Sequence, residues 1–253
     1  MGLQLRNEKG KLLLPLLKAS SYRCKGAPDW SSAEREFKRA IELNPNSALA
    51  HQRYSECLQT RLRFDESLAE GERAQELDPL SSQVLAELAY VYLSSRRYDE
   101  AIAGFQKALD LEPDAAWIRA ELAWAYAMKG MYAQALAECG KIREQDKTVA
   151  NENQLVASGL GWRYAVSGRR ADALRVAEEF RKLASHAYVD YYSNAMIYAG
   201  LGDNDEAERW LEKAYEEHSS SMSYLASDPF WYRMRSDPRY TDLLRRVGLP
   251  EPK

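Results

Sequence analysis

Apolar residues recur along this chain at intervals of three and four, the spacing that places side chains on one face of an α-helix. Two such faces occur between residues 82 and 115 and comprise Leu85, Leu88, Ala89 and Tyr92, then Ala101, Phe105 and Ala108. Turn residues 94–97 separate the two faces, and Pro113 follows the second one, where it prevents the helix from continuing. The pattern therefore predicts a helical hairpin of 34 residues.

The same hairpin pattern recurs along the chain. Residues of similar type stand 34 positions apart in several series: Pro45, Pro79 and Pro113; Trp30, Phe64, Tyr98 and Tyr132; Leu58, Tyr92 and Tyr126; Ala40, Ala74 and Ala108. Neither face of one hairpin is wide enough to bury itself alone, so each hairpin needs neighbours of its own kind. The spacing indicates a stack of helical hairpins.

This pattern resembles the tetratricopeptide repeat (TPR) family. The resemblance rests on small residues where the helices approach, an aromatic residue between them and a closing proline, matched by Ala101, Phe105, Ala108 and Pro113. It covers nearly the whole chain. It implies an all-α fold, a right-handed superhelical solenoid of about six helical hairpins with a C-terminal capping helix.

The extent of the 34-residue repeats divides the chain into three parts. We expect residues 1–10 to be frayed, residues 11–221 to form the solenoid and residues 222–253 to cap it. The predicted repeats span about 14–47, 48–81, 82–115, 116–149, 154–187 and 188–221, with extra residues around 150–153 in a loop. Repeat two has Ser67 and Gly71 where Ala and Phe are expected, which predicts a locally underpacked hairpin.

The C-terminal tail has helix start and stop signals outside the repeat. Asp228 and Asp237 each precede a proline, which favours the opening of a helix, and Gly248 favours the end of the last one. The apolar face of this last helix is expected to comprise Tyr240, Leu243, Leu244 and Val247. We expect the tail to cover the last apolar face of the stack.

Residues 235–249 are also similar to the C-terminal signature of TPR regions appended to bacterial winged-helix regulators, adenylate cyclases and Ser/Thr protein kinases. Residues 164–170 resemble the same group. The resemblance implies a sensory or interaction module and transfers no catalysis, because no winged helix, cyclase or kinase sequence is present.

Composition excludes several classes of function. The net charge is -3, so no strong basic field exists to hold nucleic acid. No segment approaches the roughly 20 apolar residues that cross a membrane, and the apolar run at 11–17 is too short for a signal peptide. Three widely spaced cysteines, Cys24, Cys57 and Cys139, form no C-x-x-C motif. An odd number of cysteines favours a reducing compartment, and we predict a cytoplasmic protein.

The sequence contains no recognisable catalytic or metal-binding motif. The three histidines, His51, His186 and His218, have no Ser, Cys or carboxylate partner at a known motif spacing. Glycine-rich phosphate-binding loops are absent. We therefore expect no enzymatic activity, no catalytic residues, no metal and no cofactor.

Large side chains recur where the first helices of the hairpins should face a concave groove. Equivalent positions lie 34 residues apart, or 38 residues apart across the extra residues, and are occupied by Tyr22, Glu56, Tyr90, Trp124, Trp162 and Met196. Trp117 and Tyr192 lie nearby on the same face. Tyr and Trp recur as anchors in binding sites because they supply a large contact area with few rotatable bonds. The alternative is that these rings pack between adjacent helices and stiffen the stack.

We predict a protein-protein interaction scaffold or adaptor that binds an extended or helical apolar-aromatic segment in this groove. The segment belongs to another protein or to a missing part of the same chain. Clamping of a terminal carboxylate is not expected, because Tyr22 and Glu56 stand where Asn or a cation is needed. The alternative function is a regulatory or sensory module of a larger bacterial signalling protein, and exposed groove surface also permits self-association.

Overall fold

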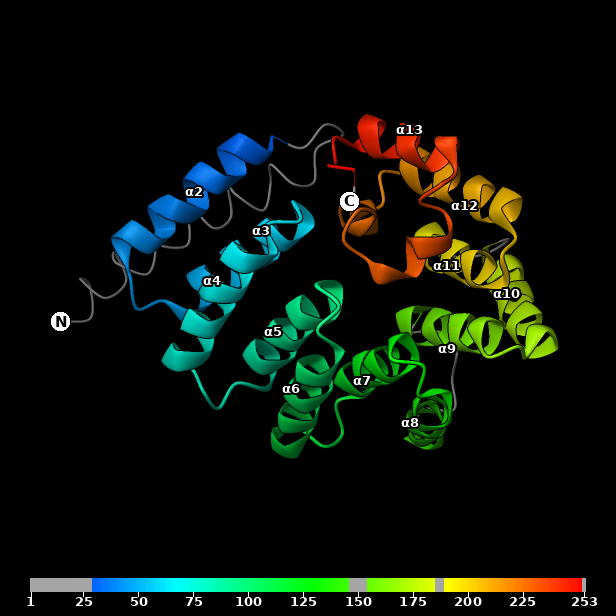
Figure 1. Ribbon diagram of the computed structural model, residues 1–253, viewed down its shortest axis with the longest axis horizontal. Helices are drawn as coiled ribbons and strands as arrows, with labels where there is room; N and C mark the ends of the chain where they lie inside the picture. The colour runs from blue at the N-terminus through cyan, green and yellow to red at the C-terminus, as the bar shows by residue number, and fades with distance from the viewer. Residues whose placement is uncertain (1–28, 146–153, 185–188, 252–253) are drawn as a thin grey trace.

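The computed structural model describes residues 29–145, 154–184 and 189–251, and all the regular structure in these ranges is helical. Figure 1 shows the helices arranged along an arc. The α-helices are α2 (Trp30–Leu43), α3 (Ala48–Thr60), α4 (Phe64–Leu77), α5 (Ser82–Ser94), α6 (Tyr98–Leu111), α7 (Ala116–Met128), α8 (Tyr132–Gln145), α9 (Gln154–Val166), α10 (Arg170–Ala184), α11 (Tyr191–Leu201), α12 (Asn204–Glu216) and α13 (Pro238–Val247).

Five complete hairpins follow the predicted repeats, from α3 with α4 to α11 with α12, and α2 is the second helix of the first repeat. The turn inside each hairpin has one residue with positive φ at the same register: Leu62, Arg96, Gly130, Gly168 and Gly202. A residue in this left-handed region allows the backbone N–H groups at the helix end to donate to the last carbonyl groups of the first helix. It also turns the chain toward the second helix. The predicted all-α hairpin solenoid is thus confirmed.

Small and aromatic residues of the 34-residue series form the interior. Phe37, Phe105 and Cys139 occupy equivalent positions between paired helices, and all three are buried. In repeat two, Gly71 stands at this position, and Ser67 stands where Ala33 and Ala101 lie in their repeats. The hydroxyl of Ser67 donates to the Ser55 carbonyl at 2.8 Å. The helix α2 starts after Asp29, whose carboxylate caps it by accepting from the Ser32 amide at 3.0 Å.

Some predictions lie outside the described residues. These are the frayed segment 1–10, the first helix of the first repeat with Tyr22 and Cys24, and the extra residues at 150–153.

The tail does more than cover the last repeat. After α12 it forms two short 3-10 helices, η1 (Ser220–Tyr224) and η2 (Pro229–Arg233), which Figure 1 shows in orange on the inner side of the arc. The last helix, α13, then packs on α12 through its predicted apolar face, which is buried, and ends at Gly248 with φ 78°. The expectation of a simple cap is therefore incomplete, because η1 and η2 run across the concave face.

The end of the tail also reaches the beginning of the solenoid. The carbonyl oxygen of Gly248 accepts hydrogen bonds from Trp30 Nε1 at 3.2 Å and from Arg61 at 3.1 Å. The Arg61 guanidinium also lies over the Trp30 ring, 5.5 Å from its centroid. The chain thus closes on itself.

Within the described ranges, every helix is too short or too polar to cross a membrane.

Candidate functional site

The first helices of the hairpins carry the predicted side chains on the concave face, one position per helix. These are Glu56 on α3, Tyr90 on α5, Trp124 on α7, Trp162 on α9 and Met196 on α11. All five lie beside the tail or the cavity that borders it, together with Trp117 and Tyr192. The structure thus places seven of the eight predicted residues on this face, five from the 34-residue series and two neighbours, and Tyr22 lies outside the described part.

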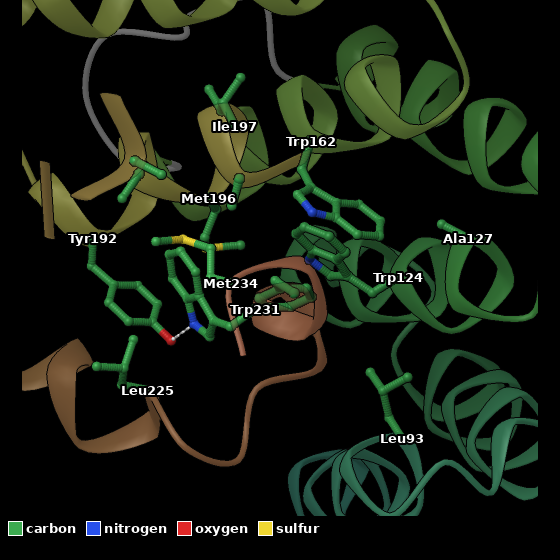
Figure 2. Close-up of a cluster of buried hydrophobic side chains, with 14 of the residues drawn as sticks. Leu93, Trp124, Ala127, Trp162, Tyr192, Met196, Ile197, Leu225, Trp231 and Met234 are labelled. Carbon is green, nitrogen blue, oxygen red and sulfur yellow. Dashed lines mark hydrogen bonds between the residues drawn. The ribbon is translucent and has the colours of Figure 1, made fainter. Parts of the chain in front are cut away.

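The tail covers the aromatic centre of this face. The Phe230 ring lies 3.9 Å from the Trp124 ring and 5.7 Å from the Trp162 ring, centroid to centroid. Trp124, Trp162 and Met196 are all buried, and Figure 2 shows them beside Trp231. In this structure their contacts are with the chain's own C-terminal segment, so these rings belong to the hydrophobic core.

A carboxylate of the tail anchors it to two first helices. Asp228 accepts hydrogen bonds from the hydroxyls of Tyr90 at 2.7 Å and Tyr192 at 2.5 Å. Trp231 Nε1 donates in turn to the Tyr192 oxygen at 2.8 Å, the bond drawn in Figure 2. Burial raises the pKa of Asp228 to about 6, and the two tyrosine hydroxyls oppose that rise because they stabilise the charged form.

The two Asp-Pro pairs of the tail therefore act differently. Asp237 caps α13 as predicted, because its carboxylate accepts from the Arg239 amide at 3.0 Å. Asp228 makes no cap hydrogen bond to η2, so its predicted capping role is wrong. Its carboxylate is turned toward the tyrosines of α5 and α11, whose hydroxyls donate hydrogen bonds to it in a buried place.

The tail extends its contacts to the second repeat. The Tyr224 hydroxyl donates to Glu56, and the Glu56 carboxylate also pairs with Arg53 at 3.1 Å. At the other end, Arg233 donates to the carbonyl of Gly200 at 3.0 Å. The segment 220–233 consequently contacts first helices from α3 to α11.

Beside the tail, the concave face keeps an open cavity of about 360 Å³. Its walls come from α3, α5 and α7, with Tyr224, Asp228 and Phe230 of the tail on one side. Trp117 lines it and is 40% exposed. The cavity also reaches Gly71, which stands at the position of Phe37 and Phe105. The Leu88 side chain packs against Gly71, where an added Cβ would lie 2.9 Å from Leu88 Cδ1, so the predicted underpacking is not found at this glycine.

A second series of residues lies one helical turn before the aromatic series and lines the same cavity. It consists of Arg53, Glu87 and Glu121, which are again 34 positions apart. Glu87 and Glu121 were not among the residues selected from the sequence, although they follow the same 34-residue spacing. Burial raises the pKa of Glu121 to about 8, with a further contribution from the charge of Asp228. Burial also raises the pKa of Glu87.

The described residues include no group of three or more side chains able to hold a metal ion. His51 has a carboxylate partner that no motif spacing indicated, since its Nδ1 lies 2.5 Å from Glu70. Its Nε2 lies 3.0 Å from the Pro45 carbonyl oxygen. Both partners tie α3 to its neighbours, and His51 does not line the cavity.

The stacked hairpins and their shared concave face define an α-helical repeat solenoid. Family models of the tetratricopeptide repeat match residues 92–158, 154–179 and 191–217. The chain is a tetratricopeptide repeat protein. A comparison with curated proteins found no match.

The fold is similar to several solved structures. Pseudomonas aeruginosa PilF has a TM-score of 0.58 at 19% identity, covering 86% of this chain and 96% of that one. PilW, described as a widely conserved type IV pilus biogenesis factor, has a TM-score of 0.60 at 18% identity, covering 81% and 91%. A tetratricopeptide repeat protein from Parabacteroides merdae has 0.55 at 16% identity, covering 94% and 92%. These likenesses concern the fold.

Proposed function

We propose that this chain is a protein-interaction scaffold that binds a segment of a partner protein in the open part of its concave face. Tetratricopeptide repeat proteins are protein-interaction scaffolds. The observation that carries the proposal is the cavity of about 360 Å³ beside the tail, with Trp117 partly exposed in its wall. An aromatic side chain that is exposed in a concave wall is well suited to anchor a ligand.

The tail supports the expected chemistry of the ligand. Phe230 packs on the rings of Trp124 and Trp162, so the concave face accepts an irregular segment with aromatic side chains. Because the tail covers those two rings, the partner contacts fall on the uncovered part. The proposed interaction residues are accordingly Trp117, Tyr90 and Glu56, of which Tyr90 and Glu56 also bond the tail. Trp162, Trp124, Tyr192 and Met196 support the tail.

This role is one of binding rather than catalysis, and the cytoplasmic location expected from the cysteines is part of the proposal. The resemblance to regions of signalling regulators stays a prediction. Self-association also stays a prediction, although the tail covers much of the groove surface on which that expectation rested.

The test is selection of random 12-residue peptides displayed on phage against the purified chain, followed by titration of the enriched peptides. We expect Trp117→Ala to weaken their binding at least about tenfold, as loss of a central anchor does. The matched control is Tyr132→Ala on α8, because Tyr132 is also 40% exposed but does not line the cavity. Circular dichroism checks that both variants fold. Equal binding by the Trp117 variant would move the interaction elsewhere.

A further inference from the structure

The cavity on the concave face is lined by an excess of acidic groups. Five carboxylates line it, and Arg53 is its one basic residue among those described. Three of the five are already held by other side chains: Glu56 by Arg53 and Tyr224, Asp228 by two tyrosines, and Asp190 by serines. The other two are Glu87 and Glu121.

These two carboxylates lack hydrogen-bond donors at one oxygen each. Oε2 of Glu87 and Oε2 of Glu121 are shielded from solvent and have no hydrogen-bond partner within bonding distance among the described residues. The Gln52 amide acts on the Glu87 carboxylate and the buried Arg163 guanidinium acts electrostatically on Glu121, and both of these side chains also keep unpaired N–H groups. The other oxygen of Glu87 accepts from Gln83 at 3.2 Å and lies 3.8 Å from Arg53. A buried polar atom without a partner is costly, and its presence in a cavity wall indicates a ligand that supplies the missing donor.

Aromatic rings line the same cavity as these carboxylates. Tyr90 and Trp117 come from α5 and α7, and Tyr224 and Phe230 come from the tail. Aromatic faces attract cations, and the combination of ring faces with carboxylates favours a guanidinium or an ammonium group. The cavity volume of about 360 Å³ is at the lower end of the roughly 300–1,000 Å³ range of ligand clefts.

We infer that the partner segment inserts an arginine side chain into this cavity, where its guanidinium donates to Glu87 and Glu121. This inference rests on the proposed function, because it names the side chain by which the partner is recognised. Arginine fits better than lysine because its planar fork donates to two carboxylates at once and stacks on aromatic rings. An apolar side chain would leave both carboxylate oxygens without donors.

The experiment measures two small probes, N-butylguanidinium and its neutral analogue N-butylurea, by NMR titration of the full chain at pH 9, above the pKa of about 8 at which the free cavity releases the Glu121 proton. We expect the guanidinium to bind at least about tenfold more tightly than the urea, the ratio typical of a hydrogen bond to a charged group. Glu121→Gln should remove this preference. Glu179→Gln on α10 makes the same charge change at an exposed position outside the cavity and should have no effect.

Selected peptides separate this inference from the proposed function. We expect them to contain arginine, and its replacement by citrulline should weaken binding to the wild-type chain but not to Glu121→Gln. Peptides that depend on Trp117 but tolerate citrulline would leave the scaffold role standing and overturn the arginine site. A chain that binds N-butylguanidinium but no peptide would refute both the scaffold role and the partner arginine, and would make the cavity a site for a free cation. Equal binding of both small probes would also overturn the inference.

Discussion

The docking of the tail on the concave face gives the most direct test of the structure, through Phe230. This side chain is only 3% exposed and packs against the adjacent rings of Trp124 and Trp162. Its truncation to alanine removes about 1.5–3 kcal/mol of apolar burial and leaves a cavity. Phe→Ala substitutions in protein cores cost about 3–5 kcal/mol in total. We expect Phe230→Ala to reduce the free energy of unfolding by that amount.

The assay is urea denaturation followed by far-ultraviolet circular dichroism and by tryptophan fluorescence. With a denaturant slope of about 2.5 kcal/mol/M, the expected loss shifts the midpoint down by about 1–2 M. Fluorescence should shift in parallel with helix content, because Phe230 covers two of the six tryptophans. Coincident curves would indicate that the tail and the solenoid unfold together.

The matched control is Tyr232→Ala in the same 3-10 helix. Tyr232 is 45% exposed, so its truncation should change the stability by less than about 1 kcal/mol. A double-mutant cycle between Phe230→Ala and Trp124→Ala should give a coupling free energy of about 0.5–3 kcal/mol. If Phe230→Ala behaves like Tyr232→Ala and shows no coupling, the tail does not occupy the concave face.

Two further predictions concern the buried acids. Tyr192→Phe should cost about 1–3 kcal/mol at pH 8 because it removes a donor from buried Asp228, and the cost should shrink at pH 5, below the Asp228 pKa of about 6. This is measured by urea denaturation, and an equal cost at both pH values would contradict the argument. The folded chain keeps a proton on Glu121 up to about pH 8, whereas the unfolded chain releases it near 4.5. This group therefore makes stability fall as pH rises between those values, and Glu121→Gln should flatten the thermal midpoint against pH over that range. An unchanged slope would show that Glu121 is ionised in the folded state.

Much of the solenoid could be predicted because its packing is local and periodic. The hairpin of residues 82–115 was expected from one series of apolar positions, and it forms α5 and α6 within those limits. Burial of Ala101, Phe105 and Ala108 between the two helices follows from the same spacing. In a repeat array each helix packs on near neighbours, so residues close in the sequence carry most of the information.

The occupant of the concave face could not be predicted in this way. The 34-residue repeat spacing selects Tyr90 and Trp124, but the repeats end before residue 222. No feature of the sequence near Phe230 indicates that this side chain packs on Trp124. Asp228 shows the same limit. Its position before a proline favours a helix cap, and only the folded chain brings the hydroxyls of Tyr90 and Tyr192 to it.

The acidic part of the cavity was missed for a different reason. Glu87 and Glu121 precede Tyr90 and Trp124 by three residues, which places them on the same side of their helices. Charged residues on helices usually face solvent, so their presence on a helix does not by itself indicate a binding site. Applying the 34-residue step to every residue type, and not only to large apolar ones, would have selected both acids.

The closure of the chain on itself has a consequence for how many repeats it can hold. An open solenoid unfolds piecewise and tolerates added or deleted hairpins, because its interactions are between neighbours. Here Tyr90 bonds Asp228 across 138 residues and Trp30 bonds Gly248 across 218 residues, so the two ends must meet at a fixed distance. Insertion of an extra hairpin would move these hydrogen-bond partners apart in space by the length of one repeat. The closing contacts thus fix the repeat number, and their large separation in the sequence predicts slower folding than that of an open solenoid with the same hairpins.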